Sequence, residues 1–163
     1  MGGRNILDGV LIANEIADEW RKSKKVGLIL KLDFNKAFDS VNWDFLFSTL
    51  YNFGFGDKWI KWIKACVPSA RISVLVNGSP TSEFHPQRGL RQGDPLSPFF
   101  FNIVDEALNI LLSKAKVLGF LKGAQVRPSG FSISHLQFAD DTILFCEATW
   151  EEVMNIKRIL RCF

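Results

Sequence analysis

Hydrophobic positions near the start of the chain predict one helix followed by one strand. The helix has an apolar face whose members recur at alternating intervals of four and three residues: Ile6, Val10, Ala13, Ala17 and Trp20. Val26–Leu32 is then a nearly uninterrupted apolar run, which is typical of a strand buried on both faces. This predicted strand leads directly into Asp33.

Two shorter helices are predicted next. The first covers Trp43–Tyr51 and stops near Gly54. The second begins after Asp57, a favourable N-cap residue, and ends before Pro68.

Alternating side chains then predict a β-hairpin. Ile72, Val74 and Val76 fall on one side of an extended segment. Asn77-Gly78 follows, which is a strong signal for a two-residue hairpin turn, and Ser79–Phe84 would be the returning strand.

A long helix follows a loop rich in Gly, Pro and Arg. The loop occupies His85–Pro98, and Ser97 within it is the predicted N-cap. The helix covers about 99–116 and ends at Gly119.

The last part of the chain predicts two strands and one helix. The strands are Phe131–Phe138 and Thr142–Cys146, joined at Asp140-Asp141, after a turn at 127–130. Thr149 opens a Thr-x-x-Glu capping box that begins the final helix. A mixture of helices and hairpins predicts the α+β class.

Composition and charge fit one globular domain over residues 1–163. The chain is 47% apolar and 23% charged, which allows a real core and does not favour disorder. A net charge of +3 is compatible with a nucleic-acid partner without indicating one. Two basic groups are each either a solvated surface or a phosphate contact: Arg21, Lys22, Lys24 and Lys25 in one, and Lys58, Lys61 and Lys64 in the other.

Cysteine and histidine residues are not spaced as metal ligands. The three cysteines match no CxxC pattern and lie among apolar residues, which predicts buried free thiols in an intracellular setting: Cys66, Cys146 and Cys162. His85 and His135 have no Cys or His at ligand spacing. No apolar run approaches the ~20 residues that span a bilayer, so no membrane partner is expected.

Three aspartates are candidates for metal chemistry. Asp33 ends a predicted strand, and Asp140 and Asp141 lie between two others. The adjacent pair alone is equally an ordinary turn. If the fold brings Asp33 beside it, the concentrated negative charge requires a cation, and such oxygen ligands suit Mg²⁺. Two ions of this kind stabilise phosphoryl transfer, but spacing alone does not show that the three positions meet.

The loop over Arg88–Pro95 is a second candidate site. Its glycines allow close backbone approach to a ligand, its arginines can hold phosphates, and Gln92 can bond to a sugar or base edge. Such a composition is also common in surface loops.

Three segments in this order resemble the A, B and C motifs of reverse transcriptases. They read KLDFNKAFDSV at 31–41, GLRQGDPLSP at 89–98 and FADD at 138–141. The KAFDSV and FADD wording is similar to that of LINE-type (non-LTR) retrotransposons, specifically plant elements. The resemblance covers nearly the whole chain. It implies a polymerase palm, in which an antiparallel sheet with a catalytic hairpin packs on helices.

The resemblance implies roles for the three aspartates and one neighbour. Asp33, Asp140 and Asp141 would be catalytic. Asp33 and Asp140 would bind two Mg²⁺ ions, or Mn²⁺ in their place, with the backbone carbonyl of Phe34 as an added ligand. Asp141 would complete the acidic cluster.

Substrate contacts follow from the same resemblance. Phe38 would be an aromatic gate against the ribose 2′-hydroxyl, with simple core packing as the alternative. Gln92 and Gly93 would line the incoming dNTP, and Arg88 and Arg91 would contact nucleic acid. The implied partners are an RNA template, a DNA primer and dNTPs, and the implied location is nuclear. The oligomeric state is left open.

The chain departs from the family pattern at both ends. We expect a palm fragment without most of the fingers and without the thumb, and therefore weak or absent activity of the isolated chain. A group II intron maturase-like reverse transcriptase and a non-catalytic nucleic-acid-binding remnant of a retroelement are the alternatives. A viral RNA-dependent RNA polymerase fits less well, because that class prefers an acid at the position of Phe38 and GDD at the hairpin.

Overall fold

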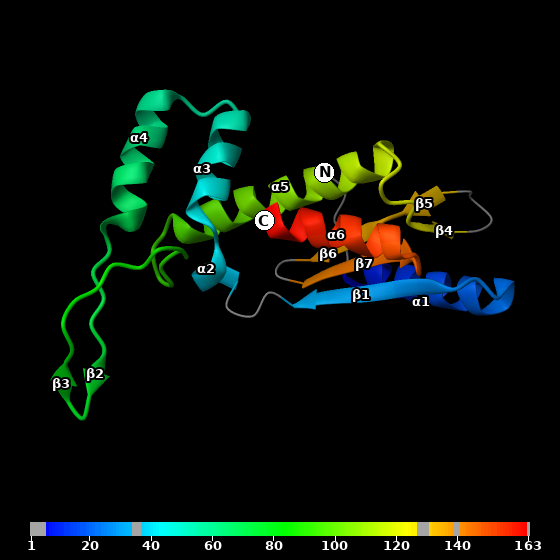
Figure 1. Cartoon of the computed structure of the whole chain (residues 1–163), viewed down its shortest axis with the longest axis horizontal. Coiled ribbons are helices and arrows are strands. Elements are labelled where there is room, and N and C mark those ends of the chain that lie inside the picture. The colour runs from blue at the N-terminus through cyan, green and yellow to red at the C-terminus, as the bar shows by residue number, and fades with distance from the viewer. Residues whose placement is uncertain (1–5, 34–36, 127–130, 139–140, 163) are drawn as a thin grey trace. The chain divides into compact units, whose positions relative to one another are not determined.

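The computed structural model describes residues 6–33, 37–126, 131–138 and 141–162. They belong to two compact units. Within the described ranges, unit 1 combines 6–33 with 109–126, 131–138 and 141–162, and unit 2 covers 37–108. Helix α5 (Ser97–Val117) contributes to both units. Helices and antiparallel strands are mixed along the chain (Figure 1), which confirms the predicted α+β class.

A three-stranded antiparallel sheet forms the centre of unit 1. Its strands are β1 (Gly27–Asp33), β6 (His135–Phe138) and β7 (Asp141–Glu147), in the order β1-β7-β6. Strand β1 pairs with β7 over its whole length, from Gly27 opposite Glu147 to Asp33 opposite Asp141. One end of this ladder therefore carries two of the candidate aspartates.

The prediction that β1 is buried on both faces is wrong. Strand β1 has one neighbour in the described sheet, and Ile29 is 43% exposed. Val26, predicted as part of the strand, precedes it and is 79% exposed. An apolar run alone does not distinguish a central strand from one at the edge of a sheet.

Helix α1 (Ile6–Ser23) covers one face of the sheet with a face that shares Ala13 and Trp20 with the predicted one but leaves Val10 and Ala17 exposed. Its packed residues are Ile12, Ala13, Ile16 and Trp20, whereas Val10 is 53% exposed. Ile16 is fully buried against Ala124 and Phe145. The Trp20 and Phe145 rings meet edge to face at 6.5 Å. The larger isoleucines set the buried face, since they remove more apolar surface from water than alanine does.

Strand β7 carries buried side chains toward both faces of the sheet. Phe145 packs toward α1, and its neighbours Leu144 and Cys146 are also fully buried. Figure 1 shows helix α6 (Trp150–Cys162) on the side of the sheet opposite α1. Ile156 of this helix is buried. The sheet of unit 1 is therefore covered on both faces.

The predicted strand over 131–138 is divided in two. Strand β5 (Phe131–Ile133) pairs with β4 (Ala124–Val126), whereas β6 pairs with β7. Ser134 lies between them, and its carbonyl accepts the N–H of Phe145 at 2.8 Å. The break lets one segment serve two sheets. The turn predicted at 127–130 lies outside the described residues.

One of the two hydrogen bonds of the predicted capping box is present before α6. The Thr149 Oγ1 accepts the N–H of Glu152 at 3.4 Å. The Glu152 carboxylate, however, accepts the N–H of Glu147 at 3.1 Å instead of that of Thr149. Glu152 therefore ties α6 back to the end of β7.

Unit 2 begins with short helices: α2 (Ala37–Ser40), α3 (Trp43–Asn52) and α4 (Asp57–Cys66), followed by one 3₁₀ turn at Val67–Ser69. Asn42 caps α3 by accepting N–H groups from Asp44 and Phe45. The prediction of Asp57 as the N-cap of α4 is wrong. Gly56 holds that position, and its carbonyl accepts the N–H of Ile60 at 3.0 Å. The buried residues of this unit include Leu46, Leu50, Ile60, Ile63, Phe100 and Val104.

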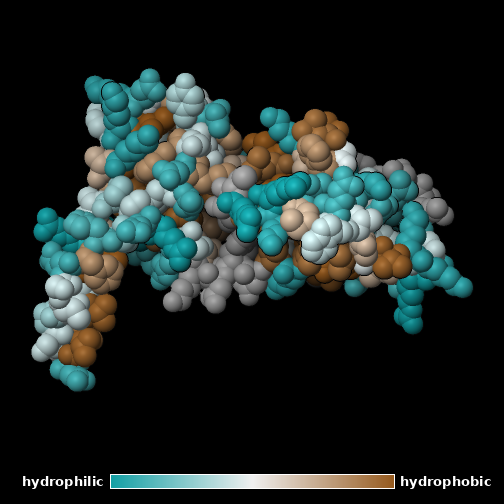
Figure 2. Space-filling model, viewed as in Figure 1, coloured by the Kyte–Doolittle hydropathy of each residue, from teal (hydrophilic) through white to brown (hydrophobic). Residues whose placement is uncertain are grey.

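The predicted hairpin is present but shorter than expected. Strands β2 (Leu75–Val76) and β3 (Ser79–Pro80) flank the Asn77-Gly78 turn, where both residues have positive φ. One further bridge joins Ile72 to Phe84. Both strands are exposed, and Figure 2 shows hydrophobic surface along this hairpin. Little packing therefore extends the pairing beyond the turn.

The loop before α5 rests on the backbone of α2 and the residue after it. Gly89 donates its N–H to the carbonyl of Val41 at 2.8 Å, and Leu90 donates to Phe38 at 2.6 Å. A Cβ on Gly89 would lie 2.6 Å from the carbonyl oxygen of Asp39, and its φ is +93°. Only glycine fits this position without displacing backbone.

Replacing Gly89 by alanine tests this contact. We expect Gly89→Ala to lower the free energy of unfolding by about 3 kcal/mol or more, because backbone overlap adds to the cost of a positive φ. Gly54→Ala is the matched control, since Gly54 has φ +83° and open space around its Cβ position; it should cost only about 1–2 kcal/mol. Urea unfolding followed by circular dichroism measures both, and equal losses would contradict the predicted overlap.

The prediction of buried cysteines holds for one residue and fails for another. Cys146 is fully buried, and burial raises the pKa of its thiol. Cys66 is exposed, because it lies in the last turn of α4 next to the 3₁₀ turn. The side chain of Cys162 lies outside the described residues.

These two environments predict different reactivity toward iodoacetamide. The native protein should be alkylated at Cys66 and protected at Cys146, because the thiolate is the reactive form and burial disfavours it. Mass spectrometry of tryptic peptides after a short exposure measures the two sites. Urea-unfolded protein is the control in which both should react. Equal labelling of both in the native protein would show that the interior of unit 1 is open.

Candidate active site

The end of the β1–β7 ladder brings two candidate aspartates into register. Asp33 and Asp141 are Cα partners in its last pair. The sequence alone left open whether these positions meet, and the strand pairing places their backbones opposite each other. Asp140 and Phe34, predicted as metal ligands, lie outside the described residues.

Lys31 is a neighbour of this site that sequence reasoning did not single out. Its Nζ lies 3.1 Å from Asp141 Oδ1, and the two side chains are 62% and 50% exposed. Lys31 stands opposite Ile143 in the ladder, so the ion pair is a diagonal one. The available signal was its position two residues before Asp33, since alternate residues of a strand share a face. At this exposure the pair adds less than about 1 kcal/mol of stability.

The donor chemistry at this end of the sheet fits a hard cation. Among the described residues, no group of three or more His, Cys, Asp and Glu side chains could hold a metal by itself. Mg²⁺ does not require such a cage, because it usually takes one or two carboxylates and completes its shell with water and substrate phosphates. Aspartates at paired positions on adjacent strands match that preference, whereas they do not match the His and Cys ligands typical of zinc.

The second set of predicted site residues lies in unit 2. Phe38, in α2, is half-buried and stacks on Phe101 of α5 with ring centroids 4.9 Å apart and planes 24° apart. This contact shows that Phe38 packs against its own unit. A role as a gate stays a prediction, because one face of a stacked ring can pack while another edge meets a ligand.

The loop between Arg88 and Gly93 presents polar groups to solvent. Arg88, Arg91, Gln92 and Gly93 are exposed, whereas Leu90 is buried and anchors the loop. Gly93 has φ +87° and nothing within 4 Å of its Cβ position. The exposed groups are therefore accessible to a ligand.

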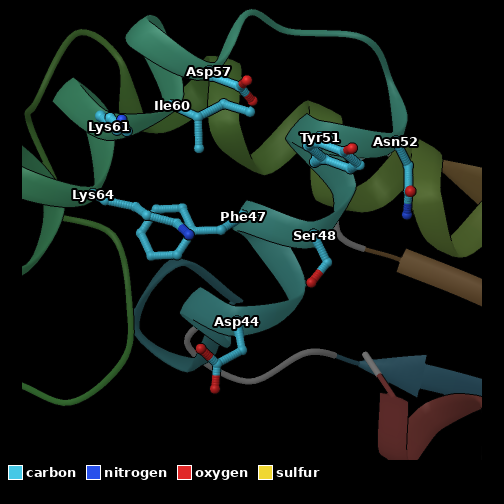
Figure 3. A pocket seen from close by; sticks show the side chains of 9 residues that line it. All are labelled: Asp44, Phe47, Ser48, Tyr51, Asn52, Asp57, Ile60, Lys61 and Lys64. Atoms are coloured by element: carbon cyan, nitrogen blue, oxygen red, sulfur yellow. The ribbon is translucent and has the colours of Figure 1, made fainter.

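A groove between α3 and α4 was not foreseen from the sequence. It has a volume of about 640 Å³, and Figure 3 shows Lys64 reaching across the Phe47 ring. The Lys64 Nζ lies 5.4 Å from the centroid of the Phe47 ring. A similar contact elsewhere on α4 joins Lys58 to Trp62, with the Lys58 Nζ 5.3 Å from the ring centroid. Asp44 and Asp57 also line the groove. With charges of both signs, it favours neither an anion nor a cation.

Within the described ranges, no helix combines the length and apolar character needed to cross a bilayer.

Comparison with known proteins gives the family of the chain. Residues 2–163 match the model of the family described as reverse transcriptase (RNA-dependent DNA polymerase). The chain is 33% identical over 142 residues to a Drosophila melanogaster protein, the retrovirus-related Pol polyprotein from type-2 retrotransposable element R2DM. That match covers 86% of this chain and 12% of the fly protein.

A plant protein and a solved structure are also similar. An uncharacterized mitochondrial protein of Arabidopsis thaliana is 47% identical over 71 residues, covering 44% of this chain and 58% of that protein. The chain thus spans less than two thirds of each of these relatives. Apo telomerase from Candida tropicalis, truncated from its C-terminal domain, matches 98% of this chain and 32% of that chain, with a TM-score of 0.57 and 16% identity. This likeness concerns the fold.

The match over residues 2–163 establishes that the chain belongs to the reverse transcriptase (RNA-dependent DNA polymerase) family, and its relatives assign it to the LINE-type (non-LTR) retrotransposon kind.

Proposed function

We propose that this chain is the palm of an RNA-directed DNA polymerase that transfers nucleotides from dNTPs to a primer 3′-hydroxyl with two Mg²⁺ ions, for which Mn²⁺ can substitute. The observation that carries the proposal is the pairing of Asp33 with Asp141 at the end of the β1–β7 ladder. Asp140 directly precedes Asp141 in the sequence, and in this proposal all three aspartates act together at that end of the sheet in a chain of this family.

The aspartates would hold the cations. Asp33 and Asp140 are the proposed ligands, with the carbonyl oxygen of Phe34. When bound, the cations would supply electrostatic stabilisation of the charge that develops on the transferred phosphoryl group. Asp141 has an auxiliary part in this proposal, because its Oδ1 lies 3.1 Å from the Nζ of Lys31. Asp33 and Asp140 are therefore the carboxylates that we assign to the cations.

The reaction is a single displacement at phosphorus. A bond forms between the primer 3′ oxygen and the α-phosphorus of the dNTP, the bond to the pyrophosphate oxygen breaks, and the 3′-hydroxyl proton passes to solvent. Positioning of the reactants supplies much of the rate acceleration in such a step. The exposed groups of the loop before α5 serve that positioning in this proposal: Gln92 and Gly93 for the dNTP, and Arg88 and Arg91 for the nucleic acid.

Phe38 would discriminate against ribonucleotides. Its stacking on Phe101 fixes the plane of its ring, and a ring held in one orientation can exclude a 2′-hydroxyl by contact. A freely rotating side chain would move aside at lower cost.

We further propose that the isolated 163-residue chain extends primers weakly or not at all. It spans 12% of the fly relative and 32% of the telomerase chain, so groups outside these residues would contribute to holding substrate in longer proteins. The alternative of a non-catalytic remnant that only binds nucleic acid makes a different prediction for metal binding.

Metal binding and primer extension test the proposed site together. Electron paramagnetic resonance measures the binding of Mn²⁺. We expect the wild-type protein to bind this ion. Asp33→Asn and Asp140→Asn should each weaken the binding at least about tenfold, because each removes a charged ligand. Asp18→Asn is the matched control, since Asp18 is an exposed aspartate of α1 and lies outside the β1–β7 ladder. Primer extension on an RNA template should be weak in wild type and absent in both site variants.

The outcomes separate the hypotheses. Mn²⁺ binding that is the same in wild type and both site variants would contradict the metal site and favour a remnant. Vigorous extension by the isolated chain that requires Asp140 would support the site and contradict the proposed weakness of the fragment.

Substitutions of the two stacked rings, Phe38 and Phe101, test the proposed gate. We expect Phe38→Ala to raise incorporation of rNTPs relative to dNTPs by about tenfold, because it removes the contact with the 2′-hydroxyl. Phe101→Ala should destabilise the protein while changing that ratio less. The ratio is measured by single-nucleotide extension in Mn²⁺, with thermal unfolding alongside. If both variants lose stability and neither changes the ratio, Phe38 has a packing role alone.

A further inference from the structure

A hollow of about 770 Å³ lies in unit 1 at the end of the sheet remote from the aspartates. Its lining includes Gly27 and Glu147, which are partners at the first pair of the β1–β7 ladder. Asp33 and Asp141 form the last pair, six residues further along β1, so about 20 Å separates the two ends at the rise of an antiparallel strand. This sheet-end hollow is therefore separate from the candidate active site.

The sheet-end hollow is positively charged. The charged residues that line it are three lysines and one glutamate: Lys25, Lys116, Lys122 and Glu147. Glu147 is already matched, because Lys122 Nζ lies 2.7 Å from its Oε2. The hydrogen bond to Glu147 raises the pKa of Lys122, so this ammonium is charged at neutral pH.

The basic group noted in the sequence adjoins the sheet-end hollow. Arg21 and Lys22 lie in the last turn of α1, and Lys24 and Lys25 follow it. All four side chains are exposed, and Lys25 lines the hollow. The exposed carboxylates nearby in the chain include Asp18 of α1 and Glu151, in the first turn of α6. Positive charge therefore exceeds negative charge around this end of the sheet.

Two exposed aromatic residues are chain neighbours of residues that line the hollow. Trp150 is 80% exposed and directly follows Thr149, which lines the hollow. Phe120 is 53% exposed and lies between two lining residues, Gly119 and Leu121. Asn155 of α6 donates a hydrogen bond to the carbonyl of Phe120 at 3.1 Å, so the two ring-bearing segments are joined. Large rings that are exposed beside lysines offer surfaces on which planar groups can stack.

We propose that the sheet-end hollow binds single-stranded nucleic acid, with Lys25 and the adjoining basic group on the phosphates and with bases stacked on Trp150 and Phe120. Proteins that hold single strands without sequence preference combine a basic groove with exposed aromatic rings, and this end of the sheet has both. A partner protein of acidic character would match the lysines but would not require two exposed rings. The inference is independent of the polymerase proposal, because it uses none of the candidate active-site residues.

Fluorescence anisotropy with a labelled oligonucleotide of about 12 nucleotides tests the proposal, in oligo(U) and oligo(dT) forms. We expect the Lys25→Gln/Trp150→Ala variant to bind both at least about tenfold more weakly than wild type, because it loses one phosphate contact and one stacked base. The slope of log affinity against log salt should fall by about 0.7 for the lost lysine. Equal affinity for the two oligomers would mean recognition by charge and stacking, and preference for oligo(U) would add a 2′-hydroxyl contact.

The matched control carries the same two changes on α4. Lys61→Gln/Trp62→Ala removes an exposed lysine and an exposed tryptophan from unit 2, and its affinity should stay at the wild-type value. Circular dichroism should show that both double variants remain folded, because all four side chains are exposed. An Arg88→Gln/Arg91→Gln variant measures separately any binding by the loop of the candidate active site.

Three results would overturn the proposal. The first is wild-type affinity in the Lys25→Gln/Trp150→Ala variant, and the second is an equal loss in the α4 control. The third is displacement of the oligonucleotide by polyglutamate as effectively as by unlabelled oligonucleotide, which would indicate a surface for acidic proteins. Photocrosslinking of 4-thiouridine oligomers to the peptide that contains Trp150 would support it.

Discussion

The antiparallel pairing of β1 with β7 is the constraint on which the arrangement of unit 1 depends. It places Asp33 opposite Asp141 at one end and Gly27 opposite Glu147 at the other. A slip of one residue would turn every side chain of β1 to the other face. The same register also presents Phe145 to α1, where the core forms. One strand register therefore determines both the geometry of the site and the packing of the core in this unit.

The start of that ladder is held by a close contact with α1. A Cβ on Gly27 would lie 2.4 Å from the Trp20 ring, so the indole packs directly on the strand backbone. Trp20 in turn meets Phe145 of β7 edge to face. Just beyond the ladder, Ala148 donates its N–H to the carbonyl of Val26 at 3.3 Å. Contacts among α1, β1 and β7 thus fix the register of the two strands.

Sequence periodicity and motif wording predicted the described helices other than α2, the hairpin turn and the α+β class, because these depend on local spacing and turn chemistry. Sequence reasoning failed where the outcome depends on the neighbours of a segment. An apolar run did not reveal that β1 has one neighbour in the described sheet, and the alternation over 131–138 did not reveal the break at Ser134. Cys66 was expected in the core because of its apolar sequence neighbours, but its place in α4 exposes it.

Sequence reasoning likewise predicted part of the candidate site and missed another part. Motifs identified Asp33 and Asp141 as members of one cluster, and the register agrees with that grouping. Neither motif nor spacing gave a role to Lys31, whose ion pair with Asp141 crosses between strands. The α3–α4 groove and the hollow at the other end of the sheet also escaped prediction, because each is lined by residues from separate elements.

The attachment of Gly89 has a consequence for the entropy of ligand binding. A segment with several glycines has many conformations, and ordering it on binding would reduce affinity. Here Gly89 and Leu90 are held by Val41 and Phe38, and the Trp43 indole donates to the carbonyl of Gly89 at 2.7 Å. Much of the conformational freedom is thus lost during folding. Any ligand of this loop meets a partly preorganised backbone, and the remaining ordering falls on the few residues after Leu90.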